Sequence, residues 1–109
     1  MFIAMNRFQI TPGQEDAFET VWRTRDSHLE DVPGFVEFRL LKGPANDDHT
    51  LYVSHTIWSS RKHFEAWTKS EAFRLAHRNV GDNKGMYLGH PNFEGFESTQ
   101  ELIGAKAVA

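Results

Sequence analysis

Residues 64–80, FEAWTKSEAFRLAHRNV, contain the side chain of this chain that is best suited to chemistry. His77 can move a proton or bind a metal ion through one ring nitrogen. Trp67 precedes it, and Thr68 to Ser70 interrupt the helical spacing, so the pattern predicts two short helices that face one pocket. A histidine on the inner face of a helix more often packs in a core than binds a metal. His77 by itself therefore decides nothing.

Two further polar residues occupy positions where apolar side chains are expected. Asn6 shares the inner face of an alternating segment with Ala4 and Phe8. A carboxamide there needs hydrogen-bond partners, which either a neighbouring backbone or a ligand can provide. Arg25 lies on the apolar stripe of a predicted helix. Either its head reaches water over an apolar stem, or its guanidinium binds an anion in a pocket.

Together, His77, Trp67, Asn6 and Arg25 supply an imidazole, a flat apolar wall, an amide donor and a cation that can pair with carboxylates. Haem needs these groups, because its iron can be held by one protein ligand and its ring occupies a large apolar slot. The joint pattern favours haem as the ligand, with His77 on the iron. Inner aromatic residues of the same helices are expected to line the slot: Trp22, Phe64 and Phe73.

Hydrophobic spacing also predicts the elements that position these residues. Alternation and turn residues predict strands at 2–10, 35–42, 50–58 and 93–97. A helix is predicted over 14–31, with Thr11 as its N-cap and Pro12 at its first position. Its predicted inner stripe is Ala17, Phe18, Val21, Trp22, Arg25, Leu29 and Val32. Two short helices, capped by Ser60 and Ser70, follow the third strand. This order predicts an α+β, ferredoxin-like βαββαβ fold whose second helix is broken in two.

Length and composition predict one domain over residues 1–109, with a weakly ordered tail from about residue 98. The hydrophobic fraction of 39% is low for a monomer that buries its whole core, and the strands predicted at 35–42 and 50–58 carry apolar residues on both faces. Helices are therefore expected on one face of the sheet and a second copy of the chain on the other, which predicts a homodimer. Residues 81–91 are predicted to form a lid over the pocket.

Several function classes are excluded or disfavoured. The chain has no cysteine, which excludes disulfides, thiolate nucleophiles, zinc–thiolate sites and iron–sulfur clusters. A net charge of −3 gives no electrostatic reason to expect nucleic acid or an anionic membrane as a partner. MFIAMNRF lacks the features of a signal peptide, and no apolar run has membrane-spanning length, so a cytoplasmic protein is expected.

Three segments carry a family resemblance over roughly residues 1–97. They are MNRF in the first strand, PGF after the first helix, and W-x2-S-x2-F-x3-H, formed by Trp67, Ser70, Phe73 and His77. They resemble the antibiotic-biosynthesis-monooxygenase superfamily, more narrowly its IsdG-like haem-degrading monooxygenases, and most of all the proteobacterial HmuQ-type members. The combination of Asn6, Trp67 and His77 is the part typical of the haem-degrading group.

The resemblance implies a dimer in which two ferredoxin-like subunits join their sheets in a central barrel, with one haem between helices and sheet in each subunit. It implies that His77 is the proximal iron ligand, that Trp67 presses the ring out of plane, and that Asn6 donates a hydrogen bond on the distal side. Arg25 is the expected partner of the propionates. The implied reaction opens the ring with O₂ and releases iron and a bilin-type product. Electrons are expected from a separate reductase or from ascorbate.

Two other functions remain open on the sequence. One is a cofactor-free monooxygenase of the same superfamily that oxidises an aromatic or quinol substrate in the same pocket. The other is a non-catalytic protein that binds or stores haem without turnover.

Overall fold

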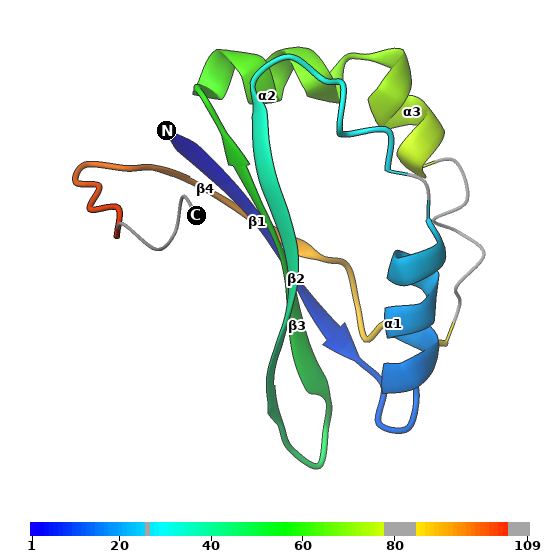
Figure 1. The fold of residues 1–109 in the computed structure, drawn as a ribbon. Helices are drawn as coiled ribbons and strands as arrows, with labels where there is room; N and C mark the ends of the chain where they lie inside the picture. Colours follow the sequence, from blue (N-terminus) through cyan, green and yellow to red (C-terminus); the bar gives the residue numbers. More distant parts are fainter. Residues whose placement is uncertain (26, 78–84, 105–109) are drawn as a thin grey trace.

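The computed structural model describes residues 1–25, 27–77 and 85–104, with the side chain of His77 excepted. A four-stranded antiparallel sheet in the order β2-β3-β1-β4 forms the framework. Its elements follow the predicted order: β1 (Phe2–Ile10), α1 (Glu15–Thr24), β2 (Phe35–Ala45), β3 (Thr50–Trp58), α2 (Arg61–Thr68), α3 (Glu71–His77) and β4 (Asn92–Glu97). All three helices lie on one side of the sheet (Figure 1). The predicted α+β, ferredoxin-like fold is confirmed.

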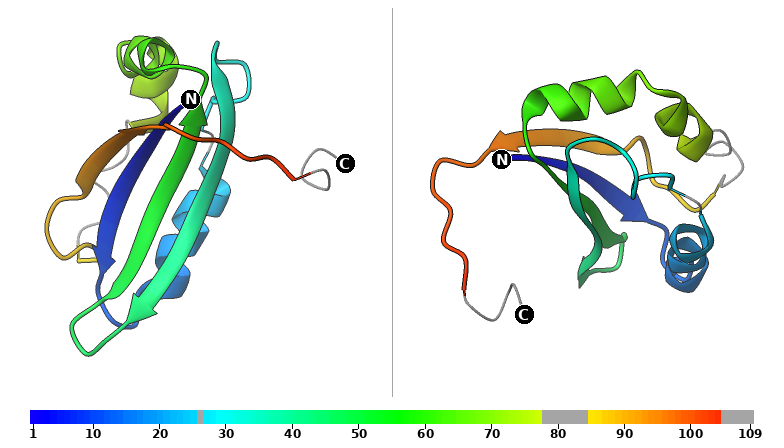
Figure 2. Two further views of the ribbon diagram at one scale, coloured as in Figure 1. Left: turned by 90° about the vertical axis from the view of Figure 1, so that its left-hand side faces the viewer. Right: turned by 45° about the horizontal axis from the view of Figure 1, so that its top comes forward.

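The other face of the sheet is left uncovered by the helices. The left view of Figure 2 looks onto this face, with the strands in front of the helices and the segment after β4 running across the sheet near its upper end. In the described part of that segment no strand forms. Instead Ser98 donates its backbone N–H to the Met1 carbonyl at 2.9 Å, and Glu101 lies 3.3 Å from the N-terminal ammonium.

The inner face of β1 is the one that the alternation predicts. Phe2, Ala4, Phe8 and Ile10 are buried against the helices, and Asn6 is half-buried on the same face. β1 pairs with β3 on one side and β4 on the other, so it is central to the sheet. Its inner side chains therefore reach the middle of the helix-covered face.

The first helix is shorter than predicted. α1 ends at Thr24, and Arg25 already has the extended dihedral angles φ −73° and ψ 134°. The Thr24 hydroxyl bonds back to the Thr20 carbonyl at 2.8 Å, a local bond that competes with helix continuation. Further along, Pro33 disfavours a helical conformation at the residue before it. The prediction of one helix over 14–31 is thus wrong, and Leu29 reaches the core from a turn.

The predicted start of that helix is also corrected. Gln14 is the N-cap residue, and the Thr11 hydroxyl instead donates to the Gly85 carbonyl at 2.8 Å. Ala17, expected on the inner stripe, is exposed, whereas the neighbouring Phe18 is fully buried against the sheet.

The boundaries of the outer strands shift by a few residues. β2 continues to Ala45 through an irregularity between Lys42 and Ala45, and β4 begins at Asn92. Among the described residues, no helix is both long enough and apolar enough to span a membrane.

Candidate functional site

A hollow opens in the middle of the helix-covered face because small side chains meet there. Asn6 pairs with Ser54, and Ala4 with Thr56, in the antiparallel register of β1 and β3. The pairs on either side of these two are aromatic: Phe2 with Trp58, and Phe8 with Tyr52. Large side chains thus build two separate cores, one under α1 and one under α2, with a low floor between them.

The hollow is a cavity of about 220 Å³. Its floor consists of the four small residues Ala4, Asn6, Ser54 and Thr56. The remaining lining comes from α1 and the segment after it, from β2, and from the two short helices: Trp22, Arg25, Ser27, Leu29, Phe38, Phe64, Trp67 and Ala76. A flat apolar ligand with a few polar atoms would match this combination of aromatic walls and polar floor.

The predicted break between the two short helices positions Trp67. Ser60 caps α2 by accepting the N–H of His63 at 3.3 Å. Ser70 accepts the N–H of Phe73 at 3.2 Å and donates its hydroxyl to the Trp67 carbonyl at 2.6 Å. Both caps were predicted from the sequence, and both are confirmed. The chain therefore turns immediately after Trp67 and begins α3 with Phe73 facing back toward it.

Trp67 is held by aromatic contacts. Its ring centroid lies 5.2 Å from that of Trp58 and 4.8 Å from that of Phe73, with the Phe73 ring edge-on at 85°. Phe64 adds a third contact at 6.0 Å. Edge-to-face contacts of this kind restrict the orientation of the indole. Trp67 is thus a fixed wall of the cavity, supported from behind.

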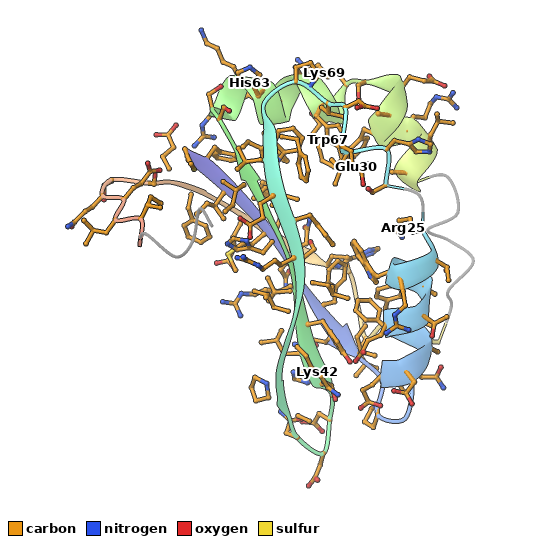
Figure 3. The ribbon with its side chains drawn as sticks, viewed as in Figure 1. Arg25, Glu30, Lys42, His63, Trp67 and Lys69 are labelled. Carbon is orange, nitrogen blue, oxygen red and sulfur yellow. The ribbon has the colours of Figure 1, made fainter. Side chains whose placement is uncertain are left out.

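Arg25 stands on the opposite side of the cavity, at the end of α1 (Figure 3). Its guanidinium carbon lies 4.4 Å from the Trp22 ring centroid, and Trp22 in turn stacks on Phe38 at 5.6 Å and 13°. Burial lowers the pKa of Arg25 below its ordinary value. Within the described ranges, no carboxylate forms a salt bridge with it. A half-buried cation without an acid partner is suited to bind an anionic ligand group.

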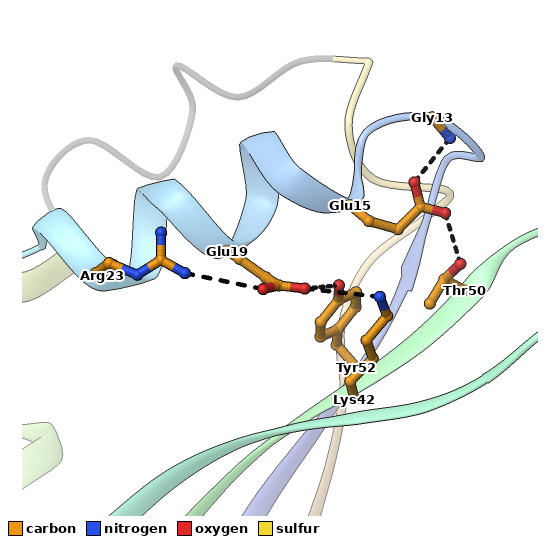
Figure 4. Close-up of polar contacts among 7 residues, drawn as sticks. All are labelled: Gly13, Glu15, Glu19, Arg23, Lys42, Thr50 and Tyr52. Carbon is orange, nitrogen blue, oxygen red and sulfur yellow. Dashed lines mark hydrogen bonds and ion pairs between the residues drawn. The ribbon is translucent and has the colours of Figure 1, made fainter.

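A polar network fixes α1 on the sheet (Figure 4). The Thr50 hydroxyl and the Gly13 N–H both donate to the Glu15 carboxylate, at 2.7 and 2.9 Å, and the Thr50 bond is the main reason that the pKa of Glu15 is lowered. The Tyr52 hydroxyl donates to Glu19, and burial together with this bond raises the pKa of Tyr52. These bonds tie α1 to β3 and so set the positions of Trp22 and Arg25.

The structure brings most of the sequence-predicted site residues together. Asn6, Trp22, Arg25, Phe64 and Trp67 line the one cavity, and Phe73 supports Trp67 from behind. His77 is the last residue of α3, directly after the cavity residue Ala76, and its side chain lies outside the described part. Its role as an iron ligand stays a prediction. No cluster of three or more metal-binding side chains occurs in the described ranges.

The predicted lid over 81–91 is described from residue 85 onward. There the chain packs against the end of β1, where Thr11 donates to the Met86 carbonyl at 2.9 Å and Leu88 donates to the Gln9 carbonyl at 2.8 Å. Met86 belongs to the core under α1. Residues 81–84 lie outside the described residues.

Sequence reasoning missed four cavity residues: Ser27, Phe38, Ser54 and Thr56. A signal was present for the last two. Ser54 and Thr56 are polar positions in phase with buried Tyr52 and Trp58, just as Asn6 is in phase with Phe2 and Phe8. Polar residues in phase with a buried face mark a floor rather than a core.

Comparison with known proteins agrees with the architecture. The family described as antibiotic biosynthesis monooxygenase matches residues 1–79. A "Heme oxygenase (staphylobilin-producing)" of Staphylococcus haemolyticus is 32% identical over 72% of this chain and 75% of its own length. A "Heme-degrading monooxygenase" of Bacillus thuringiensis is 32% identical over 80% of this chain and 87% of its own length. The heme-degrader MhuD from Mycobacterium tuberculosis, solved with two hemes bound in its active site, has a TM-score of 0.70 at 23% identity, covering 94% of this chain and 99% of that one.

Proposed function

The chain belongs to the antibiotic biosynthesis monooxygenase family, and from that premise we propose that it is a haem-degrading monooxygenase. It would bind haem between the sheet and the helices and open the porphyrin with O₂ and external electrons, releasing iron and a bilin-type product. The observation that carries this proposal is the cavity. It combines an aromatic wall at Trp67, an amide on the floor at Asn6 and the half-buried cation of Arg25, which forms no salt bridge with a described carboxylate.

The described residues fit the chemistry of haem. Aromatic faces suit its apolar ring, and the guanidinium of Arg25 can pair with a propionate. The volume of 220 Å³ is below the roughly 300–1,000 Å³ of pockets that enclose drug-sized ligands. Haem binding therefore requires the walls to separate.

Each site residue receives one role. His77 would hold the iron, which supplies the binding and activation of O₂. Trp67 would press on the ring face, and its contacts with Trp58 and Phe73 make it rigid enough to bend a macrocycle rather than yield to it. Asn6 would donate a hydrogen bond from the floor. Arg25 would pair with a propionate and so fix how the ring is turned within the slot.

The open face of the sheet supports the proposed homodimer. This face carries apolar side chains of β1 and β3, namely Ile3, Met5, Val53 and Ile57. Phe96 of β4 pairs with Ile3 on the same face and is 46% exposed. An apolar sheet face of this kind is stabilised by a second apolar surface.

We propose that the electron donor is a separate molecule, either a reductase or ascorbate. The predicted cytoplasmic location is retained as part of the proposal.

A haemin titration followed by ascorbate under air tests the proposed function. The expected result is a saturable Soret band that bleaches after reductant is added, with free iron and a ring-opened product found by mass spectrometry. His77→Ala is expected to lose the spectrum of the ligated iron. Tight binding without bleaching would instead establish a haem-binding protein and refute the enzyme.

A cofactor-free monooxygenase is the second candidate, and the cavity volume favours it. A space of 220 Å³ accepts a smaller aromatic or quinol substrate without movement of the walls. Absence of saturable haemin binding, together with oxygen uptake in the presence of a quinol, would select this function.

A further inference from the structure

Ser54 is a mostly buried residue of the cavity floor, and the proposed function assigns no role to its hydroxyl. It is 7% exposed, lies on the central strand β3, and pairs directly with Asn6 of β1. Side chains directly opposite in an antiparallel pair have Cβ atoms about 4.5–5.5 Å apart. The hydroxyl of Ser54 and the carboxamide of Asn6 are therefore close enough to contact the same small ligand.

The protein itself makes no use of this hydroxyl within the part that the structure describes. Ser54 Oγ has no hydrogen bond there, whereas the hydroxyl of its floor neighbour Thr56 donates to the Ala4 carbonyl at 3.2 Å. The side chain of Asn6 likewise has no partner among the described residues. On the β2 side, Ser54 faces Leu40, which offers no acceptor. Ser54 Oγ is not among the fully buried polar atoms that lack a partner, so it opens into the cavity that its residue lines. A ligand in the cavity can therefore supply its hydrogen-bond partner.

We propose that Ser54 is a second hydrogen-bonding residue of the site, which acts with Asn6 on the dioxygen consumed in the proposed reaction. This inference rests on the proposed function. One side chain can donate a single hydrogen bond to O₂, which leaves the molecule free to swing about it. A second donor from the adjacent strand fixes its direction, and with it the carbon of the ring that is attacked. Ser54 is thus expected to determine regiochemistry as well as rate.

Thermal unfolding distinguishes a hydrogen-bonding role of Ser54 toward a ligand from a role in stabilising the fold. Removing this hydroxyl leaves no described residue without its hydrogen-bond partner, so Ser54→Ala should unfold at the same temperature as the parent protein or higher. If Ser54 instead stabilised the fold, Ser54→Ala would lower that temperature. Ser54→Thr retains the hydroxyl on a strand that accepts β-branched residues, and it serves as the conservative variant.

The experiment compares the parent, Ser54→Ala, Ser54→Thr, Asn6→Ala and the Asn6→Ala/Ser54→Ala double variant. Each is measured by haemin titration, by the C–O stretching frequency of the reduced carbon-monoxide complex, and by the isomer distribution of the ring-opened product. Ser54→Ala is expected to bind haemin normally, raise the C–O frequency, mix the product isomers and slow turnover about five- to tenfold, as expected for one neutral hydrogen bond. Ser54→Thr is expected to restore the parent values.

Three outcomes overturn the inference in different ways. If the parent binds and degrades haem while Ser54→Ala keeps the parent C–O frequency and product isomers, Ser54 has no role and the proposed function stands. If the parent binds no haemin, both fail together. Strictly additive effects of the Asn6 and Ser54 substitutions on turnover would show that the two do not act on a common ligand.

Discussion

Filling the cavity with a larger side chain on its floor distinguishes a ligand site from a packing defect. Ala4 is 5% exposed and lies at the bottom of the hollow, so Ala4→Leu places its added carbons in the cavity. At about 24 cal/mol per Å³, a sealed and dry cavity of 220 Å³ would cost about 5 kcal/mol, which is an upper bound for this open one. Such a cost is a large part of the stability of a small domain, which suggests that the hollow is retained for a ligand.

The expected gain from Ala4→Leu follows from the carbons added. Three buried carbons contribute about 2 kcal/mol at ~0.8 kcal/mol each. Ordering the leucine side chain costs about 0.5–1 kcal/mol, so the net gain is about 1–2 kcal/mol. For a domain of this size the midpoint of thermal unfolding should rise by about 4–8 °C. Haemin binding should be lost, because the new side chain occupies the slot beneath Trp67.

Differential scanning fluorimetry and haemin titration measure the two effects on the same samples. Ala17→Leu is the matched control, since Ala17 is exposed on α1 away from the cavity and its substitution should change stability by less than about 0.5 kcal/mol. Unchanged haemin affinity in Ala4→Leu would refute this cavity as the haem site. A fall in the unfolding temperature would show that the floor is already packed.

Three further predictions concern the walls and the chain that supports them. Arg25→Ala should weaken haemin binding about tenfold or more, because a charge-assisted hydrogen bond is lost. Arg25→Lys should recover part of the affinity. Equal haemin dissociation constants for the parent and Arg25→Ala would exclude a propionate contact. Trp67→Ala should give a flatter bound haem, seen in resonance Raman spectra, and slower ring opening. It should also lower the free energy of unfolding by about 2 kcal/mol, roughly half the loss for a fully buried tryptophan. Unchanged turnover would refute the bending role. Gly34→Ala should destabilise the fold in urea unfolding by more than the ~1–2 kcal/mol of left-handed strain, because Gly34 has φ +84° and a Cβ there would lie 2.2 Å from His63 Cγ. His63 Cβ would also lie only 2.4 Å from the added Cβ, so the rescue variant is His63→Gly, compared with His63→Gly alone. It should recover the steric part and leave the strain, and an equal loss of stability with and without His63 would refute the clash.

The site was predictable from sequence wherever local rules apply. The alternation of β1 puts Asn6 on the buried face, and the serines that cap α2 and α3 fix the break after Trp67. Each of these features depends on side chains within a few residues of one another. Strand periodicity and helix capping depend on interactions between residues that are close in sequence, so a single sequence is enough to identify them.

Arg25 shows where such rules fail. The apolar stripe predicted that the helix continues to Asp31, yet it ends at Thr24, because Leu29 gains more by packing with Trp58 and Phe2 in the core under α2 than by extending α1. That preference depends on a core assembled from distant segments. The spacing of apolar residues along the helix carries no information about that core. The same spacing nevertheless identified Arg25 as a residue of the pocket.

Ser54 marks the limit more sharply. Its sequence neighbours predict a polar strand residue on the buried face, and its importance comes from the register that places it opposite Asn6 on the neighbouring strand. The same register aligns small residues in two adjacent rows and aromatic residues in the rows beyond them, which is what opens the cavity. The amino-acid sequence alone determined which side chains could do chemistry and the faces they occupy. Only tertiary pairing decided which of them share a ligand, because the distance between two strands is set by the whole sheet.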